Sequence, residues 1–240
     1  DKDQKQILMT ELQMSFEIDP KDYNLDSRYL WAVGPAADQV PSPELNAVIE
    51  SVTTKAFNNK LENVLWNGGI GTITGWVADI GGADSNGTVV DATPAGAVTA
   101  LNIEGKLEEM KNLMPANVRD NPARSGRLAF VTTPELRQLW GDVLTNKDQK
   151  NNDTTDTPRY FFQGYEVMSS HAVPVDNIYF MVVGDTDQAA LKAAVWINSD
   201  RFNITMGKGH DLDDVWGVKV CAPIGTASLF NGEIVRYLPV

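Results

Sequence analysis

Histidine and aspartate side chains in the second half of the chain are the first candidates for chemistry. The two histidines of the sequence are His171 and His210. His210 comes shortly before three carboxylates that, together with an imidazole, could hold a hard cation: Asp211, Asp213 and Asp214. The order of these ligands matches no calcium loop, and the run Asp84-Ser85-Asn86-Gly87 lacks the downstream glutamate of one. We interpret both segments as solvated acidic turns and expect no metal site.

A glycine-rich stretch, Gly68-Gly69-Ile70-Gly71-Thr72-Ile73-Thr74-Gly75, invites comparison with phosphate-binding loops. It follows a predicted helix, whereas those loops follow a strand, and it has no Gly-Lys-Ser/Thr ending. Thr74 also stands where the dinucleotide-binding fingerprint has glycine. We therefore interpret the stretch as a helix stop followed by a turn, and no cofactor is expected.

Nucleophilic catalysis finds no support in the residue pattern either. Cys221 lies in the apolar run Val218–Ala222 and is interpreted as a small buried hydrophobe. The sequence has no Gly-x-Ser-x-Gly turn, and no motif supports a pair of catalytic carboxylates. Its six tryptophans are more typical of core or interface anchors than of a cofactor site. No catalytic, cofactor-binding or metal-binding residue is therefore predicted.

The elements that would position any site follow from apolar periodicity. Leu12, Met14, Phe16 and Ile18 alternate with polar residues, which predicts a strand. Ser42-Pro43 has the residue types of a helix start, and an apolar stripe at helical spacing continues from there to the stop at Gly68-Gly69. This pattern predicts one long helix. The following segment, 68–96, is rich in turn residues and is expected to form turns and short extended pieces.

Two shorter helices and a series of strands are predicted downstream. One helix follows Asn102 and ends at Pro115, and another starts at Thr133-Pro134. Residues 147–158 are almost without apolar side chains and are predicted to form an exposed loop. Strands are predicted from β-branched and aromatic content at 128–131, 165–168, 178–183, 193–197, 202–206, 215–222 and 234–238. The fold class is therefore α+β, with helices concentrated in the first half.

Charge and composition exclude several classes of protein. The 240 residues include 32 Asp and Glu against 20 Lys and Arg, a formal net charge of −12. Proteins that grip DNA phosphates need basic stripes, so direct duplex binding is not expected. No stretch approaches the ~20 continuous apolar residues of a membrane span. The chain begins with Asp1 and without an apolar leader, which suggests a processed or trimmed protein.

The order of these elements resembles the tailed-phage capsid fold, of the Hong Kong ninety-seven type, from about Lys5 to Val240. The helix end Leu61–Gly69 is similar to the terminus of that family's long spine helix. Leu128–Glu135 resembles its axial-lobe strand that runs into a helix. Gln163–Val167 is similar to its Gly-x-Pro-Val strand entry, with Glu166 where proline is common, and Val183-Gly184-Asp185 looks like its Gly-Asp strand end.

The resemblance implies an α+β subunit with two lobes. A peripheral lobe, made of the long spine helix and β-strands, would comprise residues 1–92 and 215–240. An axial lobe, with helices around a mixed sheet, would comprise residues 93–214. The family's N-terminal arm and extended loop, which clasp neighbouring subunits, precede the first matched strand. They are expected to be missing from this chain, which would then be a fragment.

The function implied by the resemblance is structural and not enzymatic: a major capsid subunit of a tailed phage or prophage. Its partners would be other copies of itself, forming an icosahedral shell that encloses DNA without sequence-specific binding. No membrane and no small-molecule substrate are expected, and the location would be the virion, with the host bacterial cytoplasm during assembly. One alternative is a nanocompartment shell of the same fold that encloses a cargo protein. Another is an unrecognised α+β enzyme or binding domain with a deep pocket.

Overall fold

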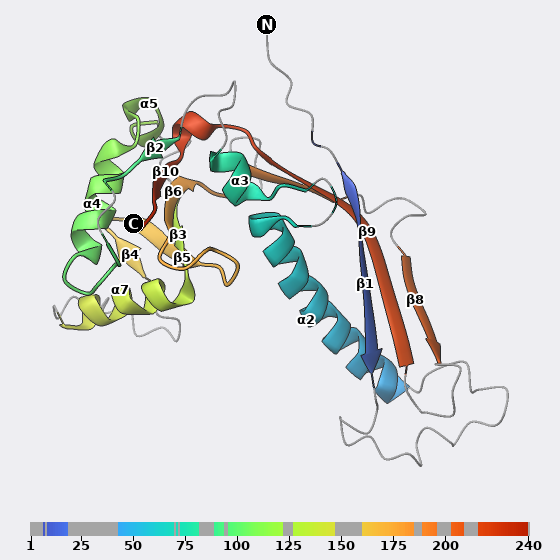
Figure 1. The fold of residues 1–240 in the computed structure, drawn as a ribbon. Coiled ribbons are helices and arrows are strands. Elements are labelled where there is room, and N and C mark those ends of the chain that lie inside the picture. Colours follow the sequence, from blue (N-terminus) through green and yellow to red (C-terminus); the bar gives the residue numbers. More distant parts are fainter. Residues whose placement is uncertain are drawn as a thin grey trace, which may run out of the picture.

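The fold comprises an extended arm and a more compact part, and the chain passes between them several times (Figure 1). The computed structural model describes residues 7, 9–18, 43–69, 71, 73–81, 89–93, 96–121, 127–146, 160–184, 189–195, 203–208 and 216–239. Helix α2 and strands β1, β8 and β9 form the arm, whereas α4, α5 and α7 surround a second sheet in the compact part (Figure 1). Among the described residues, no helix combines the length and apolar character needed to cross a membrane.

The sheet of the arm is organised around one long strand, β9 (Trp216–Ser228). Strand β1 (Thr10–Ile18) pairs with it antiparallel, from Thr10 opposite Ile224 to Ile18 opposite Trp216. Strands β8 (Asn203–Lys208) and β7 (Leu191–Val195) also pair antiparallel with β9. Ile224 and residues 216–221 have partners on both sides, so β7 and β8 follow one another along the edge of β9 that faces away from β1.

Helix α2 (Pro43–Asn67) lies against this sheet and is the long helix that the sequence predicts. Its 25 residues correspond to about 37 Å at ~1.5 Å per residue. Val64 on the helix packs with Leu12 of β1 and with Ala222 and Ile224 of β9 in a small buried cluster. The apolar positions nearer the helix start that the structure describes, such as Val52 and Phe57, are only half-buried. The helix therefore packs most tightly at its C-terminal end.

The sheet of the compact part has six strands in the order β2-β10-β6-β3-β5-β4. Pairs β2/β10 and β3/β5 are parallel and the other pairs are antiparallel, so the sheet is mixed. All five residues of β3 and of β6 are buried, as expected for central strands that are covered on both faces. The strands are β2 (Val90–Asp91), β3 (Leu128–Thr132), β4 (Phe161–Phe162), β5 (Tyr165–Ser169), β6 (Ile178–Val182) and β10 (Val235–Tyr237).

Helices α4 (Ile103–Leu113) and α7 (Pro134–Asn146) cover one face of this sheet. Their apolar stripes enter one cluster with Phe130 and Phe180, whose rings are stacked 4.2 Å apart. A short helix, α5 (Ala116–Arg119), follows α4, and a 3-10 turn, η2 (Asn231–Glu233), leads from β9 to β10. Both longer helices start within two residues of the positions that the sequence predicts, and α4 ends two residues before the predicted stop at Pro115.

The structure confirms the α+β class and differs from the expectations in two elements. Helix α3 (Trp76–Gly81) lies in a segment expected to hold only turns and extended pieces, and β9 continues six residues beyond its predicted end. Strands β7 and β8 come from the range 93–214 but pair in the arm, whereas β2 and β10 come from the flanking ranges but pair in the six-stranded sheet. The division into lobes at these boundaries stays a prediction, and residues 147–158 lie outside the described residues.

Candidate functional site

The structure describes two of the residues singled out for chemistry, His171 and Cys221, and they lie on different elements. His171 is exposed in the turn between β5 and β6, and Cys221 is half-buried on β9. His210, its neighbouring aspartates and the Asp84 run lie outside the described residues. Within the part of the chain that the structure describes, no three His, Cys, Asp or Glu side chains lie close enough to hold a metal ion.

The glycine-rich stretch forms a tight loop at the C-terminal end of α2. Gly68 and Gly75 have φ angles of +69° and +77°, and a Cβ atom on Gly75 would lie 2.3 Å from the Gly68 nitrogen. The two glycines therefore pack backbone against backbone, and the Gly68 N–H donates to the Val64 carbonyl at 2.8 Å. This confirms a helix stop followed by a turn. The C-terminal end of a helix carries partial negative charge, which disfavours a phosphate there.

An aromatic cluster fills the junction between α2, α3 and the six-stranded sheet. Trp66, near the end of α2, packs edge-on against Trp76 of α3, with ring centroids 5.4 Å apart. On its other side it packs against Tyr179 of β6, also at 5.4 Å. Burial raises the pKa of Tyr179, which stays neutral at physiological pH. Trp66 is thus a core anchor at the junction, and Trp140 anchors the other face of the sheet.

Polar contacts tie the same junction to both sheets. The Asn67 side-chain amide donates to the Ala172 carbonyl at 2.8 Å, and the Ser170 hydroxyl donates to Glu62 at 2.5 Å, so the end of α2 is held by the β5–β6 loop. On α3, the Trp76 indole N–H donates to the Lys192 carbonyl at 3.0 Å, which links the helix to β7. The arm is therefore fixed to the compact part by directional bonds as well as by packing.

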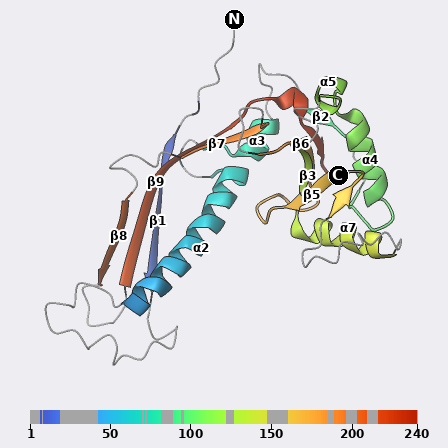
Figure 2. The same ribbon diagram turned by 180° about the vertical axis from the view of Figure 1, so that it is seen from behind.

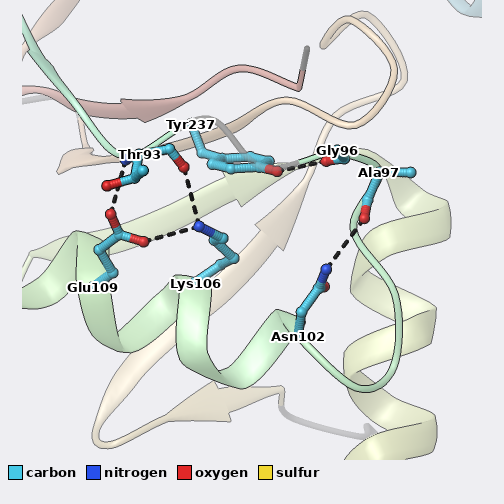
Figure 3. Close-up of polar contacts among 7 residues, drawn as sticks. All are labelled: Thr93, Gly96, Ala97, Asn102, Lys106, Glu109 and Tyr237. Atoms are coloured by element: carbon cyan, nitrogen blue, oxygen red, sulfur yellow. Dashed lines mark hydrogen bonds and ion pairs between the residues drawn. The ribbon is translucent and has the colours of Figure 1, made fainter.

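A second network holds the loop between β2 and α4 (Figure 3). Glu109 accepts a hydrogen bond from the Thr93 N–H at 2.8 Å, and Lys106 donates to the Thr93 carbonyl at 3.0 Å. Lys106 also pairs with Glu109 at 3.0 Å and lies 5.2 Å from the centre of the Tyr237 ring. The Tyr237 hydroxyl donates to the Gly96 carbonyl at 2.6 Å. The first half of the loop is thereby held between α4 and β10.

The second half of this loop is held by Asn102, at the start of α4. Its side-chain oxygen accepts from the Thr99 N–H at 2.7 Å. Its amide donates to the Ala97 carbonyl at 3.2 Å, as Figure 3 shows. The backbone N–H of Ile103 donates to the Thr99 carbonyl at 3.0 Å, which extends the helical spiral back to residue 99. Val98 is buried beneath the loop. The described part of the loop, residues 92–93 and 96–102, is therefore held by several independent contacts.

Sequence reasoning identified neither the junction bonds nor this loop. Asn102 was recognised only as the residue before a helix; its side chain makes no capping hydrogen bond to α4 and bonds instead to Thr99 and Ala97 of the preceding loop. The junction bonds and the Tyr237–Gly96 bond join residues more than 100 positions apart in sequence, whereas the Thr93 contacts join residues 13 and 16 positions apart. No local pattern reports such a pairing.

Comparison with known proteins identifies the fold of the chain. No protein-family model and no curated protein sequence matches the chain. Several solved structures match nearly all of it. The capsid of an empty GTA particle gives a TM-score of 0.60 at 14% identity, covering 96% of this chain and 72% of that chain. The satellite phage P4 procapsid, which includes the size determination (Sid) protein, gives 0.58 at 11% identity, with 98% and 73% covered.

A third match is the holo-SrpI encapsulin complex from Synechococcus elongatus PCC 7942. Its TM-score is 0.57 at 15% identity, and the alignment covers 96% of this chain and 73% of that chain. The three matches share a mixed α+β architecture with the present chain. The chain therefore has the fold of phage capsid and encapsulin shell proteins, the Hong Kong ninety-seven type that the resemblance implied.

Proposed function

We propose that this chain is a shell-building subunit, the major capsid protein of a tailed phage or prophage, whose copies assemble into a closed icosahedral shell. The observation that carries the proposal is the fold match over 96–98% of the chain to a GTA capsid, a phage procapsid and an encapsulin. The enzyme alternative is not favoured, because the matched structures come from shells.

The architecture suits a mechanical role. A subunit that tiles a shell must hold its contact surfaces at fixed relative positions, because each contact is repeated in every copy. Here α2 runs the length of the arm, and the Trp66 cluster and the Asn67 and Ser170 hydrogen bonds join it to the compact part. The arm would belong to the peripheral lobe and the six-stranded sheet to the axial lobe.

The content of the shell distinguishes two versions of this function. A net charge of −12 is compatible with DNA that is enclosed without being gripped, since strong phosphate binding needs clustered basic residues. In this version the protein is located in the virion, and in the host bacterial cytoplasm during assembly. The SrpI match supports the second candidate, a bacterial nanocompartment shell that encloses a cargo protein.

Electron microscopy of the purified full-length protein tests the proposal. We expect closed shells of uniform diameter at micromolar concentration. Nuclease-protected DNA inside them would support the phage capsid, and a co-purifying protein cargo would support the nanocompartment. A small species of constant mass, unchanged by protein concentration or ionic strength, would contradict both versions.

A further inference from the structure

Asn-Gly pairs occur three times in the chain, at residues 67–68, 86–87 and 231–232. Asparagine is a chemically labile residue, and it is most labile before glycine, whose unhindered backbone nitrogen can attack the side-chain amide carbon. Residues 86 and 87 lie outside the described residues. The other two pairs differ in their surroundings, since Asn67 is exposed at the end of α2 and Asn231 is 0% exposed in η2. Of these two side chains, solvent water therefore reaches only Asn67.

Hydrogen bonds hold both reacting groups of the Asn67-Gly68 pair. The Asn67 side-chain amide donates to the Ala172 carbonyl at 2.8 Å, and the Gly68 N–H donates to the Val64 carbonyl at 2.8 Å. The end of α2 that carries the pair lies next to α3, where the arm meets the compact part (Figures 1 and 2). Attack requires both bonds to break, because the amide must rotate toward the nitrogen and the nitrogen must lose its proton. The pair can therefore react only when the helix end opens locally.

We propose that Asn67 is a modification site, whose deamidation is controlled by opening of the junction between the arm and the compact part. In the opened state the Gly68 nitrogen forms a bond to the Asn67 side-chain carbon. The bond from that carbon to the amide nitrogen breaks, and ammonia leaves with the proton of the Gly68 N–H. Water then hydrolyses the cyclic imide at either carbonyl, which gives aspartate or isoaspartate. Water is the only co-reactant.

The product of this reaction cannot restore the closed junction. A carboxylate has no hydrogen to donate to the Ala172 carbonyl, and its negative charge lies at the negative end of the helix dipole. Isoaspartate also adds a methylene group to the backbone directly before Gly68. That loop has no room to spare, since a Cβ atom on Gly68 would lie 2.5 Å from the Thr74 backbone. Each conversion therefore loosens the connection of α2 to the β5–β6 loop irreversibly.

Peptide mass spectrometry of the full-length protein tests the control by structure. The protein is incubated at mildly alkaline pH, folded or unfolded in urea, and the deamidated fraction at Asn67 is followed over time. We expect deamidation in the folded protein to be at least about tenfold slower, because only the opened fraction reacts. Equal rates in the two states would overturn the proposal.

A variant that loosens the junction without changing the reacting residues tests which opening matters. Ser170→Ala removes the hydroxyl that donates to Glu62 at 2.5 Å. We expect deamidation of Asn67 to be at least about threefold faster in this variant, with no change at the buried Asn231. An unchanged rate at Asn67 would contradict control by the junction. Equal acceleration at both sites would also contradict it, because the whole protein would then be opening.

The variant Asn67→Asp reproduces one product and tests its effect. It should melt at a lower temperature than the wild type, and amide hydrogen exchange should be faster in the β5–β6 loop. Asn59→Asp adds the same charge at an exposed position two turns earlier on α2 and should change neither quantity. Identical behaviour of the two variants would overturn the claim that deamidation loosens the junction.

None of these measurements requires shells. A protein that never assembles would therefore contradict the proposed function and leave the modification site standing. Closed shells together with equal deamidation rates in folded and unfolded protein would do the reverse.

Discussion

Glu109 shows, at the scale of single residues, how charge holds a surface loop in place. The hydrogen bond from Thr93 is the largest cause that lowers the pKa of this carboxyl, and Lys106 lowers it further, against the opposing effect of partial burial. The ionised form is therefore favoured more in the folded than in the unfolded protein. Its negative charge stabilises the loop that presents Leu101.

The pH dependence of stability should report this contact. Because the folded pKa lies below the unfolded value of about 4.3, the stabilisation is complete above that pH and is lost as pH falls through the folded pKa. We expect Glu109→Gln to melt at a lower temperature than the wild type at pH 7, with the difference shrinking between about pH 4.5 and pH 3. Thermal unfolding followed by circular dichroism measures it.

The exposed neighbour Glu108 provides the control, since Glu108→Gln removes one charge from α4 without touching the Thr93 contact. A melting-temperature difference for Glu109→Gln that stays constant from pH 7 to pH 3 would contradict this account.

The loop that ends α2 illustrates how an element is terminated. Gly68 and Gly75 both need left-handed backbone angles and contact each other's backbone, so neither position has room for a side chain. Gly69 also has a left-handed angle, φ +88°, but a Cβ atom there would meet nothing within 4 Å. A side chain at Gly69 would therefore meet backbone strain alone, whereas a side chain at Gly68 or Gly75 would also clash with neighbouring backbone atoms.

Alanine substitutions should rank these two effects. Gly69→Ala should cost about 1 kcal/mol of unfolding free energy, the strain of a left-handed non-glycine residue. Gly75→Ala adds the backbone clash and should cost clearly more, at least about 2 kcal/mol. Urea denaturation of the two variants measures the difference. Equal costs would show that the loop relaxes around the new methyl group.

At the scale of the whole molecule, stability depends on the junction between the arm and the compact part. Trp66 contacts both α3 and β6, whereas Trp140 lies entirely within the cluster under α4 and α7. Helix α2 packs on β1 and β9. Of the two tryptophans, only Trp66 connects this helix to the six-stranded sheet. The two tryptophans are a matched pair, since both are at least 96% buried.

Hydrogen exchange measured by mass spectrometry should distinguish them. Trp66→Ala and Trp140→Ala should each cost about 3–5 kcal/mol, as removal of a buried tryptophan does. Trp66→Ala should reduce amide protection in β1 and β9 as well as in β6, because it disconnects the two parts. Trp140→Ala should act mainly on β3, β5 and β6. The same pattern of lost protection in both variants would mean that the protein unfolds as a single unit.

The sequence by itself determined where most helices and strands lie and that their class is α+β. Apolar spacing is a local property of the sequence. The apolar stripe of α4 and the alternation of β1 could therefore be recognised without knowing which elements they pack against. The glycine loop was interpreted correctly for the same reason. Helix α3 was missed because six residues among glycines carry too little periodicity.

Only the tertiary structure decided which strands share a sheet and which surfaces stay exposed. Strand β9 pairs with β1, which lies 198 residues before it at the Ile18–Trp216 end of the ladder and 214 residues before it at the Thr10–Ile224 end. No local pattern encodes such a partner. The Thr93, Lys106, Glu109 and Tyr237 network likewise joins β10 to a loop far earlier in the chain. Leucine is a residue type typical of protein cores, and only the tertiary structure shows that the Leu101 side chain is 98% exposed.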